Sequence, residues 1–134
     1  MTSSRIRARS ILTDGGESQR GSVTLENTII YSALVLLLGV GLHFGILFHG
    51  NNTAHQAAVI ALQELRLADG SDAAAVAAAH SYLDGGIVEG AWVDISKGPE
   101  RTTVTVTGTT NTFVPGLENQ ISETVVGPTE RWVD

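Results

Sequence analysis

The chain has 134 residues, no cysteine, 43% apolar residues and a formal net charge of −6. This length is typical of a single domain. Eight basic side chains against fourteen acidic ones argue against a nucleic-acid binder that relies on a basic face, and against acidic substrates. The lack of cysteine excludes disulfides, thiolate zinc sites and a cysteine nucleophile. Because both ends are polar, the positive mean hydropathy of +0.14 predicts one concentrated apolar block.

That apolar block runs from Thr28 to Phe48 without any Asp, Glu, Lys or Arg. As a helix it would cover roughly 32 Å, close to the thickness of the bilayer's hydrocarbon core. It is apolar on every side, unlike the one-faced stripe of a soluble amphipathic helix. Its glycines, Gly39, Gly41 and Gly45, weaken a helix in water but allow close helix packing in membranes. The block therefore predicts a transmembrane helix.

The charges on the two sides of the block predict its orientation. Residues 1–20 hold four arginines and two acids, whereas residues 22–134 hold four basic and twelve acidic side chains. The positive-inside rule places the N-terminus in the cytoplasm and the C-terminal part outside. A cleaved secretory signal peptide is the rival interpretation. It fits poorly, because its apolar region would be shorter and would precede a small-residue cleavage site.

An acid stands where the apolar block begins: the sequence from Arg20 to Glu26 is RGSVTLE. A glutamate at this place costs free energy unless it is paired or reaches the membrane interface. One interpretation is that Glu26 simply lies among head groups, where the helix dipole favours an acid in the first turn. The other is a paired functional carboxylate.

The RGSVTLE stretch resembles the processing site of type IV prepilins and pseudopilins. In these proteins a membrane aspartyl peptidase, the prepilin peptidase, cuts directly after a glycine, and the fifth residue of the mature chain is glutamate. The resemblance implies cleavage between Gly21 and Ser22, with Glu26 in the fifth position. It also implies that the new ammonium group of a neighbouring subunit pairs with the Glu26 carboxylate and fixes the axial register between subunits.

A narrower resemblance, from Arg20 to Trp132, is to the TadE-like pseudopilins of the tight-adherence (Flp-type) pilus, in their actinobacterial form. Its carriers are the segments RGSVTLE, AHQAAVIALQELRLADG, TVTVTG and VPGLENQISETVVGPTERW. The chain departs from the family at Asn27, where a small or apolar residue is commoner. It also departs at residues 64–66, where Glu-Leu-Arg replaces a smaller stretch.

Beyond Phe48, alanines at three- and four-residue spacing predict that the helix continues to Ala68, where Asp69-Gly70 stops it. Ser71 is expected to cap a second, alanine-rich helix that has an acid in its first turn. Gly85 would end this helix in the left-handed conformation.

From residue 87 onward the composition changes to Val, Thr and Ile, and the period becomes two. Strands are predicted at residues 87–96, 101–112 and 119–126. The first should have Ala91, Val93 and Ile95 on one face, and the second should oppose a threonine face to a valine face. Together they predict an antiparallel meander whose apolar face packs on the helices, and hence an α+β fold.

No metal or catalytic site is predicted. His43, His49 and His55 are six residues apart, which places successive rings on different helix faces. The sequence holds no nucleophile elbow, phosphate loop or dinucleotide motif. His43 is expected to pack as a neutral ring against a neighbouring helix. Of Trp92 and Trp132, one is expected to anchor the core and the other to lie at the surface or an interface.

These patterns and the resemblance predict three parts: a cytoplasmic leader at residues 1–21, an N-terminal helix at 22–68 with the transmembrane span 28–48, and a small extracytoplasmic α+β domain at 69–134. The resemblance implies a pilin-like fold and a minor pseudopilin, a structural assembly component without catalytic site, cofactor, nucleic acid or small-molecule substrate. Its partners would be the membrane, the prepilin peptidase, other pilins and the pilus assembly platform. The alternative is an uncleaved single-pass envelope protein with a small ligand-binding domain.

Overall fold

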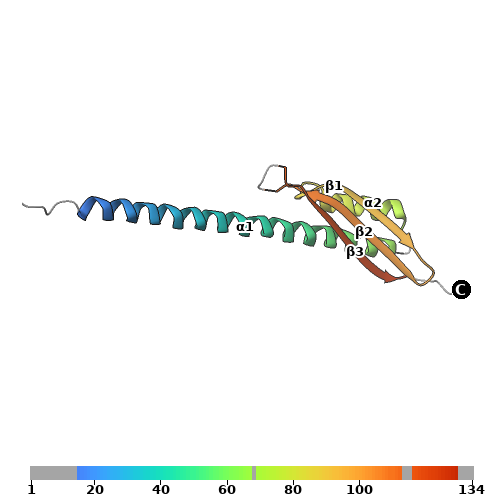
Figure 1. The fold of residues 1–134 in the computed structure, drawn as a ribbon. Helices are drawn as coiled ribbons and strands as arrows, with labels where there is room; N and C mark the ends of the chain where they lie inside the picture. The colour runs from blue at the N-terminus through green and yellow to red at the C-terminus, as the bar shows by residue number, and fades with distance from the viewer. Residues whose placement is uncertain (1–14, 68, 113–115, 130–134) are drawn as a thin grey trace, which may run out of the picture. The chain divides into compact units, whose positions relative to one another are not determined.

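The computed structural model describes residues 15–67, 69–112 and 116–129, and side chains from residue 23 onward. Within these residues the fold is α+β, with two helices and one three-stranded antiparallel sheet (Figure 1). The elements in chain order are α1 (Gly15–Leu65), α2 (Asp72–Leu83), β1 (Val88–Lys97), β2 (Arg101–Thr110) and β3 (Asn119–Pro128). This confirms the expected class: a long apolar helix, a short helix and a meander. Most of the expected leader, residues 1–14, lies outside the described part.

The chain divides into two compact units, Met1–Leu38 and Gly39–Asp134. The boundary falls inside α1. In the first unit the described part is helical, and its side chains from Val23 to Leu38 are exposed. The second unit contains the rest of α1, the helix α2 and the whole sheet.

The ends of α1 differ from the expected bounds of 22–68. The helix begins earlier, at Gly15, and ends earlier, at Leu65. The helix ends in a tighter turn. The Leu67 N–H donates to the carbonyl of Glu64 at 3.2 Å, three residues back instead of the four of an α-helix. A side chain at Gly70 would overlap this same Glu64 oxygen. The chain therefore leaves the helix before the Asp69-Gly70 pair that was expected to stop it.

The expected caps of α2 are confirmed. The Ser71 hydroxyl accepts a hydrogen bond from the Ala74 N–H at 3.1 Å, which satisfies one of the free donors at the helix start. Asp72 lies in the first turn, where the helix dipole favours an acid. It also pairs with Lys97 at the end of β1. Gly85 follows the helix with φ of +76°, the left-handed conformation that glycine adopts without strain.

The sheet is a meander in the order β1-β2-β3, with strand bounds within two residues of the predicted ones. Along β2, Val104 and Val106 are fully buried, and the threonines that alternate with them, Thr103, Thr105 and Thr107, face the other side. Thr102 and Thr110 share the valine face and are also buried. Ala91, Val93 and Ile95 lie on the core side of β1, as predicted.

A β-bulge interrupts β1 between Glu89 and Trp92, where the register with β2 shifts. Gly90 lies in the bulge with φ of +60°, a conformation that other residues rarely adopt. The extra residue shifts the inward-outward alternation. Val88 and Val93 are therefore both buried although they are an odd number of positions apart. A strict period of two could not predict this.

The core of the second unit is built largely from small side chains. It comprises Ala54, Ala57, Ala58, Ala61 and Leu62 from α1, Ala75, Ala79 and Leu83 from α2, and Val88, Val93, Val104, Val106 and Ile121 from the sheet. No aromatic side chain of the described residues belongs to it. Alanine lets a helix backbone lie close to a sheet, so α1 and α2 pack tightly on one sheet face.

Glycines bring α1 and the sheet closest together. A Cβ atom at Gly50 would lie 2.5 Å from Cδ1 of Ile121 and equally close to Cγ2 of Thr110. Both neighbours are buried, so neither can move away easily. A Cβ at Gly127 of β3 would lie 2.8 Å from Cδ2 of Leu62. The packing of α1 on the sheet thus requires the absence of a side chain at these points.

We expect Gly50→Leu to lower the free energy of unfolding by about 1–3 kcal/mol, because the added side chain overpacks a closed contact. Gly45→Leu is the matched control, since a Cβ at Gly45 meets no atom within 4 Å. It should leave stability unchanged or raise it by up to about 1 kcal/mol, because leucine is a better helix former than glycine. Urea unfolding of the full chain in detergent micelles, followed by circular dichroism, measures both. Equal effects of the two variants would contradict the close approach.

Candidate functional site

The first functional feature is the apolar stretch of α1. One helical segment of the described chain, Val23–Leu65, is long and apolar enough to cross a membrane, and its most apolar window is not buried. The large apolar side chains from Val23 to Phe48 that lie exposed have exposed fractions from 44% at Val40 to 80% at Phe48. A continuous exposed apolar surface marks a membrane or protein contact. The stretch is consistent with a membrane anchor.

One face of α1 is covered already within the expected span 28–48. His43, Ile46 and Leu47 are half-buried, and Gly50 is buried. Their three- and four-residue spacing places them on one side of the helix, in line with the alanines of the core. The last turns of the expected span therefore expose only part of their circumference, whereas Val23 to Leu38 is exposed all round.

The predicted cleavage and assembly residues lie in the first turns of α1. The peptide bond between Gly21 and Ser22 is part of the helix. Glu26 follows one turn after Ser22, so the two positions lie on the same side of the helix. Thr28 and Phe48, the expected ends of the span, are both exposed positions of α1. The helix thus brings Ser22 and Glu26 together along one face.

The polar groups at this end of α1 differ in their hydrogen bonding. The Thr28 and Ser32 hydroxyls donate to the carbonyls of Thr24 and Thr28, each at 2.8 Å, so the helix itself satisfies them. The exposed Glu26 carboxylate has no hydrogen-bond or ion-pair partner among the described residues. In an apolar environment it needs a partner from outside the described chain.

The histidines have separate environments. His43 places its ring against that of Phe44, with centroids 6.0 Å apart and planes at 77°. Its Nδ1 atom is buried and has no hydrogen-bond partner in the described structure. His55 lies beside the sheet, with Nδ1 at 3.7 Å from the Glu123 carboxylate. No three potential metal ligands gather anywhere in the described residues.

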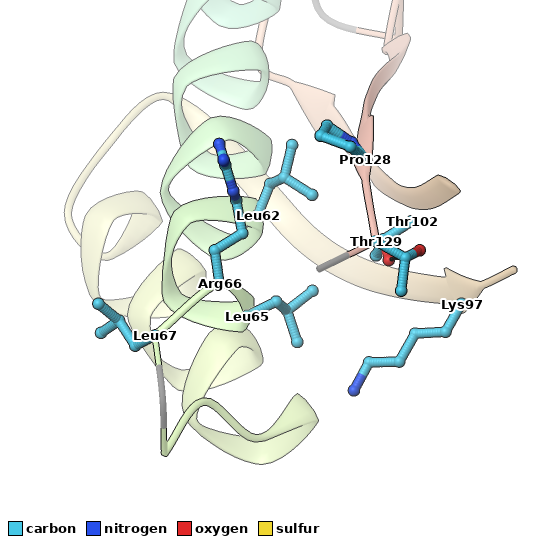
Figure 2. A pocket seen from close by; sticks show the side chains of 8 residues that line it. All are labelled: Leu62, Leu65, Arg66, Leu67, Lys97, Thr102, Pro128 and Thr129. Atoms are coloured by element: carbon cyan, nitrogen blue, oxygen red, sulfur yellow. Dashed lines mark hydrogen bonds between the residues drawn. The ribbon is translucent and has the colours of Figure 1, made fainter. Parts of the chain in front are cut away.

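A cavity of about 250 Å³ lies between the end of α1 and the strand ends. Figure 2 shows its lining side chains: Leu62, Leu65, Arg66, Leu67, Lys97, Thr102, Pro128 and Thr129. The two basic residues suggest an anion, but Lys97 is already paired with Asp72.

The hydroxyls of this cavity are also committed. Thr129 donates to the Gly98 carbonyl at 3.0 Å, so Thr102, whose hydroxyl lies 3.0 Å from that of Thr129, must donate to Thr129. Neither hydroxyl proton is left for a ligand. The cavity is also smaller than typical ligand pockets. We interpret it as a packing gap between α1 and the strands, not as a ligand site.

Sequence reasoning missed one surface feature, the outward position of Trp92, which is 70% exposed. Gly90, in an otherwise strand-like run, was the available signal of the bulge that sets this position.

No protein-family model, no curated protein and no solved structure matches the chain.

Proposed function

We propose that the chain is a pilin-like assembly subunit, a minor pseudopilin of the TadE type in a tight-adherence pilus system. In this proposal α1 crosses the membrane once, with its N-terminus in the cytoplasm. A prepilin peptidase cuts between Gly21 and Ser22, and the mature chain assembles through its N-terminal helix. The observation that carries the proposal is the apolar stretch of α1 that directly follows the RGSVTLE sequence and is exposed on all sides as far as Leu38.

The energetics of α1 support a membrane location for its apolar stretch. Each exposed leucine, isoleucine, valine or phenylalanine side chain would gain about 1.5–3 kcal/mol by leaving water. Many such side chains follow one another between Val23 and Phe48. The backbone adds no cost in lipid, because a helix satisfies its own hydrogen bonds.

The architecture of the second unit supports the pilin-like part of the proposal. The same helix that carries the apolar stretch continues to Leu65 and contributes alanines to the core of the small domain. In this proposal one end of the helix anchors the subunit in the membrane, and the other end forms part of the core of the domain outside. The position of the subunit in the membrane therefore determines the position of its domain. That link suits a protein whose work is assembly, and it requires no catalytic group.

Glu26 supports the assembly role. Its carboxylate lacks a partner among the described residues, and an unpaired acid costs free energy wherever it enters the apolar layer, up to about 2.5–3.5 kcal/mol at the centre of a bilayer. The ammonium group that cleavage creates at Ser22 of a neighbouring subunit would offset this cost. Because the two charges must meet at one height, the pair would also fix the axial register.

The N-terminus of the mature protein distinguishes this proposal from an uncleaved membrane anchor with a ligand-binding domain. In cells that contain a working prepilin peptidase, we expect intact-mass spectrometry to find a chain that starts at Ser22. Gly21→Leu should prevent processing, because the bulky side chain replaces the glycine that the resemblance requires. Gly16→Leu, at another glycine of the leader, should leave it unchanged. A mature chain that starts at Met1 would overturn the proposal.

Glu26→Gln tests the carboxylate separately from processing. The variant keeps the side-chain shape and removes the charge, so we expect a chain that is still cut before Ser22. Pilus output, measured by immunoblot of the sheared surface fraction, should fall at least about tenfold, since the loss of 1.4 kcal/mol at a contact is a factor of ten. Glu64→Gln, the same exchange near the other end of α1, serves as the control. Normal output from Glu26→Gln would remove the assembly role of the carboxylate.

A further inference from the structure

The outer face of the sheet is open. Both helices pack on the opposite face, where the core lies, and no described element covers the outer one (Figure 1). From the strand register, the outward positions are Glu89, Trp92, Asp94 and Ser96 of β1, Thr103, Thr105, Thr107 and Thr109 of β2, and Gln120, Ser122, Thr124 and Val126 of β3. Most of these side chains carry a hydroxyl group.

Trp92 is the aromatic side chain among these outward positions. Its indole is 70% exposed, although tryptophan is mostly buried in folded proteins. The bulge at Gly90 produces this position, because a regular strand that buries Val88 would also turn residue 92 inward. Bulges often direct a side chain to a functional place. Trp92 is thus the surface tryptophan of the expected pair, and Trp132 lies outside the described residues.

The register places two hydroxyls in line with the indole. Trp92 is opposite Thr107, and Thr107 is opposite Ser122. The row spans about 10 Å across three strands, since neighbouring strands lie about 4.8 Å apart. Within the described structure the Thr107 and Ser122 hydroxyls make no hydrogen bond. In the next row, by contrast, Thr105 and Thr124 bond each other at 3.1 Å.

The charges on the outer face of the sheet indicate which class of partner it can bind. The row of Trp92, Thr107 and Ser122 is uncharged, and each neighbouring row holds one acid of β1, Glu89 opposite Thr109 and Asp94 opposite Thr105. The chain as a whole carries a net charge of −6, which disfavours anionic polymers and anionic lipid surfaces. A second copy of this face would bring hydroxyls against hydroxyls, with little apolar area to bury. A neutral, polyhydroxylated partner fits best.

We infer that the outer face of the sheet binds a neutral polysaccharide. A pyranose ring has one face of C–H groups, which stacks on the exposed indole of Trp92. Its hydroxyls lie at the ring edge, where those of Thr107 and Ser122 exchange hydrogen bonds with them. The row is long enough for two successive sugar rings. This inference does not depend on cleavage before Ser22 or on pilus assembly.

The first test is co-sedimentation of the full chain with insoluble cellulose, chitin and starch. The chain is reconstituted in phosphatidylcholine nanodiscs, because detergents with sugar head groups would compete. We expect retention on at least one polymer, and Trp92→Ala should lower the bound fraction at least about fivefold. Tyr82→Ala is the matched control, since Tyr82 is also exposed but lies on α2. Both variants should keep the circular dichroism spectrum of the parent chain.

A second measurement follows Trp92 directly. The chain has two tryptophans, so Trp132→Phe leaves Trp92 as the only indole. Soluble oligosaccharides of the retained polymer should shift its fluorescence emission. Thr107→Val and Ser122→Ala should each weaken binding about two- to tenfold, the range expected for one hydrogen bond.

Three outcomes would overturn the inference. The first is no retention on any of the three polymers, and the second is equal retention of Trp92→Ala and the parent chain. The third is strong quenching of the Trp92 emission by brominated phosphatidylcholine in the nanodisc, because the face would then lie on the lipid surface.

Discussion

The close approach of α1 to the sheet is the constraint on which the small domain depends. Four alanines and one leucine of α1 enter the core, and Gly50 leaves no room for a side chain against Ile121 and Thr110. Alanine buries little apolar area, so each residue contributes less hydrophobic free energy than a leucine would. The domain therefore relies on dense contact, and α1 is a structural part of it as well as an apolar anchor.

Periodicity was enough to predict the elements of the fold but not their irregularities. Alanine spacing, the Ser71 cap and the valine-threonine alternation of β2 each follow from local rules. The end of α1 at Leu65 depends on a tighter turn that follows it. The bulge in β1 depends on one glycine within an otherwise regular strand. The core side of Val93 follows from its alternation with Ala91 and Ile95, but the burial of Val88 on the same face could not be predicted from a period of two.

The candidate functional residues can be divided in the same way, into those that a local pattern predicts and those that only the fold places together. Gly21, Ser22 and Glu26 could be predicted from a short sequence because the chemistry proposed for them is local: a small residue, the amine that cleavage would create and an acid one turn further on. Their roles depend on a peptidase and on other subunits, which the geometry of one chain does not contain. The surface around Trp92, in contrast, required the strand register, because its three aligned residues come from three different strands.

The helical conformation of the Gly21–Ser22 bond has a consequence for the proposed processing. A peptidase that binds its substrate as an extended chain can act only after the first turns of α1 unwind. Glycine lowers the cost of this unwinding by about 1 kcal/mol relative to alanine. Cleavage would then place a positive charge at the positive end of the helix dipole, which the dipole disfavours. Processing would thus create a helix start at which the new positive charge and the helix dipole repel each other. An acid in the first turn would reduce this repulsion.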